Sequence, residues 1–69
     1  MEIKYLIEVK GPAWFYKFDP NENDPIYTYM ATEALSFKTG GEAVKYLEER
    51  IKPASLVDIE HMVTEHRFY

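Results

Sequence analysis

The sequence predicts a small α+β domain in which one helix packs on one face of a three- to four-stranded, mainly antiparallel sheet, in the order β-β-β-α-β. Two observations lead to this fold class. Several short segments alternate apolar with polar residues or are rich in aromatic rings, whereas one segment shows helical spacing behind a capping signal. The chain has 69 residues and no cysteine. We therefore expect one domain over residues 1–69, folded without disulfides or thiolate metal sites.

The first two strands are predicted at the amino-terminal end. Residues 2–10 alternate apolar and polar side chains, and only Leu6 interrupts the polar series. Gly11 and Pro12 then predict a turn, because neither residue continues a strand easily. Residues 13–18 are rich in aromatic rings, which pack well on a pleated surface. We expect the two segments to pair as an antiparallel hairpin.

A loop and a third strand are predicted next. Residues 19–25 combine prolines with asparagines and acids, so they predict an exposed loop. Residues 26–30 return to aromatic and β-branched residues and predict the third strand. Residues 31–38 fit no long regular element, and we expect a loop or short turn there.

The helix has the clearest local signal. Thr39 is followed three residues later by Glu42, which is the spacing of a capping box, and Pro53 ends the helix. A last strand is predicted over residues 56–67, with alternate side chains on one face: Val57, Ile59, His61 and Val63. The buried stripe of the helix is expected to hold Ala43, Val44, Leu47 and Ile51.

Charge and hydropathy exclude several function classes. Twelve acidic and eight basic residues give a net charge of −4, and the basic residues are scattered singly, so we expect no direct contact with nucleic acid. No apolar run approaches the roughly 18 residues that cross a bilayer, so we expect no membrane segment. The sequence begins without a readable export signal, which favours a cytoplasmic location.

No residue pattern indicates catalysis or a cofactor. Neither serine lies in a recognised nucleophile motif. His61 and His66 are five residues apart on a predicted strand, so they point to opposite faces and do not converge on one metal ion. Residues 19–30 match only the opening of a calcium loop and lack its glycine and glutamate. We expect a protein without enzymatic activity, metal or cofactor.

Aromatic residues, 16% of the chain, exceed the evident needs of so small a core. One helix covers one face of a sheet, so we expect the other face to be open and to carry Phe15 with Leu6, or the set around Trp14 if the register is inverted. Exposed aromatic rings are enriched in protein interfaces. The competing interpretation is that these rings fill gaps in a minimal core. The candidate partner-binding residues are Leu6, Trp14, Phe15, Tyr16, Tyr27, Tyr29, Asp19, Glu22 and Asp24.

Residues 34–47 read A-L-S-F-K-T-G-G-E-A-V-K-Y-L. This segment resembles a pattern, A-x-x-F-K-T-x-x-E-A-x-x-Y-L, of small β-β-β-α-β proteins of unknown function from phages and mobile elements. The overall profile, which is short, acidic, aromatic and without cysteine, is also similar to phage-borne inhibitors of host defence such as anti-CRISPR proteins. The resemblance implies a phage-encoded accessory protein that acts on a host protein in the host cytoplasm.

We therefore expect a non-enzymatic protein-binding protein, an inhibitor or modulator of a host defence protein. It would act through the open face of the sheet or through an acidic surface that competes for a basic site. The alternative is a homodimer that binds a small ligand or nucleotide in an aromatic pocket at the subunit seam, so a second copy of the chain is also a candidate partner. The acidic surface would comprise Glu8, Asp19, Glu22, Asp24, Glu48 and Glu49.

Overall fold

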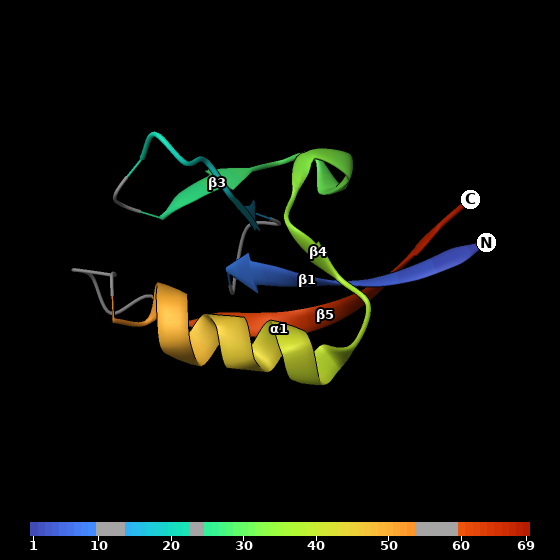
Figure 1. The fold of residues 1–69 in the computed structure, drawn as a ribbon. Coiled ribbons are helices and arrows are strands. Elements are labelled where there is room, and N and C mark those ends of the chain that lie inside the picture. Colours follow the sequence, from blue (N-terminus) through green and yellow to red (C-terminus); the bar gives the residue numbers. More distant parts are fainter. Residues whose placement is uncertain (10–13, 23–24, 54–59) are drawn as a thin grey trace.

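The computed structural model describes residues 1–9, 14–22, 25–53 and 60–69. One helical segment, α1 (Gly40–Tyr46) followed by a π-helical turn (Leu47–Ile51), lies against an antiparallel sheet in this part of the chain (Figure 1). The predicted α+β fold is confirmed. The strands of the sheet are β1 (Glu2–Val9), β2 (Trp14–Lys17), β3 (Ile26–Thr28), β4 (Ser36–Phe37) and β5 (His61–Phe68).

The central strand is β1. On one side it pairs with β5 along its whole length, from Glu2 opposite Phe68 to Val9 opposite His61. Because β5 occupies that entire side, β2 and β4 share the other side, β2 at the carboxyl end of β1 and β4 at its middle. β3 pairs with β2. Among the described strands, β3 and β5 therefore lie at opposite edges of the sheet, and the short strand β4 pairs only with β1.

The predicted hairpin and the last strand are present, with shifted ends. The second strand ends at Lys17 and the third at Thr28, while the last strand continues to Phe68. The predicted turn at Gly11 and Pro12 and the predicted strand residues 56–59 lie outside the described residues.

The segment predicted as a loop or short turn contains two elements. Ala31–Glu33 forms one turn of 3-10 helix, and Ser36–Phe37 forms β4. The prediction missed this strand, because two residues are too short to show an alternating pattern. β4 leads directly into the helix and fixes where the helix begins, beside the middle of β1.

The predicted helix cap is confirmed. The Thr39 hydroxyl oxygen accepts a hydrogen bond from the backbone N–H of Glu42 at 3.2 Å. Ala43, Leu47 and Ile51 are buried as expected, but the prediction for Val44 was wrong, because this side chain is exposed. Val44 lies about 100° round the helix from Ala43 and so falls outside the buried stripe.

The main core lies between α1 and the half of the sheet that contains β1, β4 and β5. α1 packs against these three strands, and Figure 1 shows β3 on the opposite side of β1 from the helix. One helix is therefore too narrow to cover its own side of the sheet. The core consists of Ile7, Tyr16, Ala43, Leu47 and Ile51, with Tyr5, Tyr27, Leu35, Phe37, Tyr46 and Val63 packed against it.

The far face, meaning the side of the sheet away from α1, carries Leu6 and Phe15 as predicted from alternation. Both side chains are buried, however, with 0% and 6% of their area exposed. The 3-10 turn lies over part of this face, since Glu33 forms an ion pair with Lys17 at 3.8 Å. The Phe15 ring also packs edge-on against His66, at 5.2 Å between ring centroids. The expectation that Leu6 and Phe15 lie open to solvent on this face is therefore corrected.

Candidate functional site

A row of aromatic rings crosses the helix side of the sheet over β2 and β3. Alternate residues of a strand point to the same face, and Tyr16 lies opposite Tyr27 in the β2–β3 ladder. Ring contacts run in sequence from Tyr29 to Trp14, Tyr27, Tyr16, Tyr46 and Phe37, with centroid distances of 5.2, 6.4, 6.3, 5.7 and 5.4 Å. Phe18 directly follows β2 and lines a cleft with Phe37 and Tyr46. Together these side chains form what we call the aromatic surface: Trp14, Tyr16, Phe18, Tyr27, Tyr29, Phe37 and Tyr46.

Exposure along the aromatic surface increases with distance from α1. Tyr16 belongs to the core, whereas 38% of Trp14 and 71% of Tyr29 are exposed. Trp14 and Tyr29 meet edge to face, with an interplanar angle of 88°. The inner rings therefore anchor the surface, and the outer rings present apolar area to solvent.

The inner phenol groups are paired by hydrogen bonds. The hydroxyls of Tyr16 and Tyr46 lie 3.2 Å apart, and the Tyr27 hydroxyl lies 2.7 Å from Nε2 of His61. Burial raises the pKa of Tyr16, and the hydrogen bond with Tyr46 adds to this effect. Burial also raises the pKa of Tyr27. Both phenols are thus neutral near pH 7.

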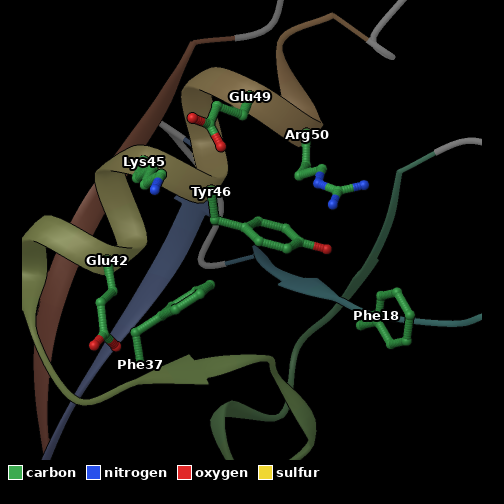
Figure 2. A pocket seen from close by; sticks show the side chains of 7 residues that line it. All are labelled: Phe18, Phe37, Glu42, Lys45, Tyr46, Glu49 and Arg50. Carbon is green, nitrogen blue, oxygen red and sulfur yellow. The ribbon is translucent and has the colours of Figure 1, made fainter.

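A cleft of about 490 Å³ lies at the helix end of the aromatic surface. Figure 2 shows the rings of Phe37 and Tyr46 beneath α1, with Phe18 across the opening and Arg50 above it. This volume falls in the range of small-molecule sites, roughly 300–1,000 Å³. The charged side chains on its rim come from α1 and the turn that follows it: Glu42, Lys45, Glu49 and Arg50.

The predicted aromatic residues come together only in part. Trp14, Tyr16, Tyr27 and Tyr29 share the helix side of the sheet, in contact with one another. Leu6 and Phe15 lie on the far face. Four of the six predicted aromatic and aliphatic side chains therefore form one surface, which lies on the side of the sheet that the sequence argument assigned to the helix.

The predicted acidic residues do not form one surface. Glu8 lies on the far face, where it accepts a hydrogen bond from the Thr64 hydroxyl. Asp19 and Glu22 lie in the turn after β2, and Asp19 accepts a hydrogen bond from the backbone of Asn21. Asp24 lies outside the described residues. The remaining two are on the helical segment, where Glu48 binds Lys52 and Glu49 lines the cleft.

None of the residues that line the cleft belongs to the predicted partner-binding set, and only Glu49 belongs to the predicted acidic surface. Tyr46 follows Ala43 by three residues, so helical spacing alone places it beside the buried stripe. Phe37 lies in the two-residue strand β4, which no periodic pattern marks. No local sequence pattern marks Arg50 as a lining residue of the cleft.

Comparison with known protein families, with curated proteins and with solved structures gave no match to this chain. Among the described residues, no helix has the length and hydropathy needed to span a bilayer.

Proposed function

We propose that this protein binds another protein through its aromatic surface. The observation that carries the proposal is the exposed edge-to-face pair of Trp14 and Tyr29, which the helix leaves uncovered on the β2–β3 half of the sheet. Met30, the next residue along the chain, is also exposed. Tryptophan and tyrosine supply large contact areas with few torsions to immobilise, and they are enriched where binding energy concentrates.

The neighbouring rings give this surface a fixed shape. Trp14 contacts Tyr27 as well as Tyr29, and Tyr27 is held by its hydrogen bond to His61. A partner therefore meets rings that are already oriented, which lowers the entropy lost on association. The adjacent edge strand β3 also offers backbone groups to a partner strand.

The test compares two side chains with the same exposed fraction on opposite faces. Trp14 and Met62 are each 38% exposed, and Met62 lies opposite Glu8 on the far face. A protein captured from bacterial lysate by the wild-type chain is identified, purified and titrated against each variant. We expect Trp14→Ala and Tyr29→Ala to weaken the complex by at least about 30-fold, which corresponds to roughly 2 kcal/mol, and Met62→Ala to leave it unchanged. Loss of binding with Met62→Ala but not with Trp14→Ala would contradict the proposal.

We take the partner to be a host protein in the bacterial cytoplasm, with this chain as a phage-encoded inhibitor. The support for this part is the resemblance of residues 34–47 to small phage and mobile-element proteins. Expression of wild-type protein in bacteria that carry a defence system should restore phage plating, and Trp14→Ala should not. Equal plating with and without the protein, across a panel of defence systems, would contradict the inhibitor role.

The cleft favours a second candidate function, binding of a small planar ligand or nucleotide. Three rings and the guanidinium of Arg50 line it within one protomer, so this function does not require a subunit seam. A ligand in the cleft should raise the melting temperature, and Phe37→Ala should remove that rise. Protein binding that depends on Trp14 but not on Phe37, with no thermal response to a nucleotide panel, distinguishes the first function from the second.

A further inference from the structure

β5 forms the edge of the sheet opposite to the aromatic surface. It pairs with β1 on one side, and no other described strand pairs with its outer side. His61–Phe68 contains neither proline nor glycine, and its pairing with β1 runs through eight consecutive residues without a bulge. In such an edge strand, alternate residues direct their N–H and C=O groups outward, where another strand can pair with them.

We propose that two copies of the chain dimerise by antiparallel pairing of their β5 strands. A two-fold axis perpendicular to the sheet relates the copies, so the same patch serves on both sides. With this axis, the helices of both copies lie on the same face of the joined sheet, and residues opposite each other across the seam point to the same face. The axis must therefore pass between the two copies of one residue, so only a few registers are possible.

Charge selects among the registers that pair most of the strand. With the axis at Glu65, two carboxylates lie directly opposite each other, which is unfavourable. With the axis at Thr64, Glu65 faces a valine and Arg67 faces a histidine, and with the axis at Val63, Arg67 lies beyond the paired residues of β5, so neither register matches both charges. With the axis at His66, Glu65 of each copy lies opposite Arg67 of the other. This last register gives two opposite-charge pairs across one seam.

Both charged residues belong to the helix side of β5, the face on which these pairs would form. The Glu65 carboxylate accepts a hydrogen bond from the Tyr5 hydroxyl at 3.1 Å, which holds it on the helix side of β5. Both Glu65 and Arg67 are exposed. Arg67 forms no ion pair with any described residue. Among the described residues its charge is thus unmatched, and the dimer places Glu65 of the second copy opposite it.

The same register covers apolar area that the protomer leaves exposed. It places Tyr69, which is 98% exposed, opposite the half-buried Val63 of the second copy.

This dimer leaves the aromatic surface uncovered. β5 and β3 are at opposite edges, so the joined sheet carries one aromatic surface near each end. The dimer does not depend on the proposed protein-binding function, and the failure of either leaves the other standing.

The test is a charge swap measured by sedimentation velocity. Glu65→Arg gives a chain with two arginines at positions 65 and 67, and Arg67→Glu gives a chain with two glutamates there. We expect a wild-type dimer, and for each single variant a dissociation constant roughly 10- to 30-fold higher, because two attractive pairs become two repulsive ones. An equal mixture of the two variants should form a heterodimer, since both cross-strand pairs are then restored.

Two controls separate the seam from general effects of charge and stability. Glu22→Arg makes the same change in net charge on an exposed residue far from β5, and it should leave the dimer unchanged. Glu65→Gln removes the charge but retains an acceptor for the Tyr5 hydroxyl. Its melting temperature, measured by thermal denaturation, shows whether the protomer stays folded. A wild-type protein that is monomeric at about 1 mM would overturn the proposal, as would single variants that dimerise like the wild type or a mixture that does not associate.

Discussion

Replacement of Leu6 by alanine distinguishes a buried far face from an exposed one. Leu6 is 0% exposed although it lies on the side of the sheet away from α1. Truncation of a fully buried leucine destabilises a protein by about 2–5 kcal/mol, because apolar contacts are lost and a cavity remains. A domain of 69 residues has a total stability of roughly 3–10 kcal/mol. Leu6→Ala should therefore remove a large part of the free energy of unfolding.

The assay is urea denaturation followed by far-UV circular dichroism, with Ile3→Ala as the control on the same strand. Ile3 is substantially exposed, so its truncation should lower the free energy of unfolding by no more than about 1 kcal/mol. Leu6→Val removes less volume and keeps a measurable transition if Leu6→Ala does not fold. A loss for Leu6→Ala no larger than that for Ile3→Ala would refute the reasoning and return Leu6 to the solvent-facing surface.

Three further predictions concern the cap and the buried phenols. Thr39→Ala should lower the free energy of unfolding by about 1 kcal/mol, measured in urea, because it removes the acceptor for a helix N–H; an unchanged midpoint would contradict the cap. Burial raises the pKa of Tyr16 above the ordinary value of 10.0, so its stabilising contribution is complete below that pH and is lost as the pH rises from there toward the native pKa. Tyr16→Phe should flatten this decline above about pH 10. Tyr27→Phe should lower the free energy of unfolding by about 1 kcal/mol through loss of its hydrogen bond to His61, and a neutral result in urea would contradict that bond.

Alternation and capping were sufficient to predict the long elements. Residues 2–9 form a strand because every second side chain is apolar, and Thr39 starts the helix because its hydroxyl accepts the N–H of Glu42. The opposite orientations of His61 and His66 also follow from their spacing, since they lie across from Val9 on the helix side and Lys4 on the far face. These features depend on residues that are close together in the sequence, so one sequence is enough to predict them.

The lateral position of the helix could not be predicted in the same way. It depends on β4, a two-residue strand that pairs with the middle of β1 and brings α1 over β1 and β5. The 3-10 turn at Ala31–Glu33 likewise covers part of the far face through contacts distant in sequence. The open rings therefore lie beside the helix and not behind it, because one helix is too narrow to cover its own side of the sheet.

The most direct test of the open aromatic surface is acrylamide quenching of tryptophan fluorescence. Trp14 is the single tryptophan of the chain, so the signal reports this surface alone. The structure predicts efficient quenching and the red-shifted emission of a hydrated indole, since Trp14 lies on the part of the sheet that α1 leaves uncovered. Blue-shifted emission that resists acrylamide in the free protein would show a covered ring and contradict the account.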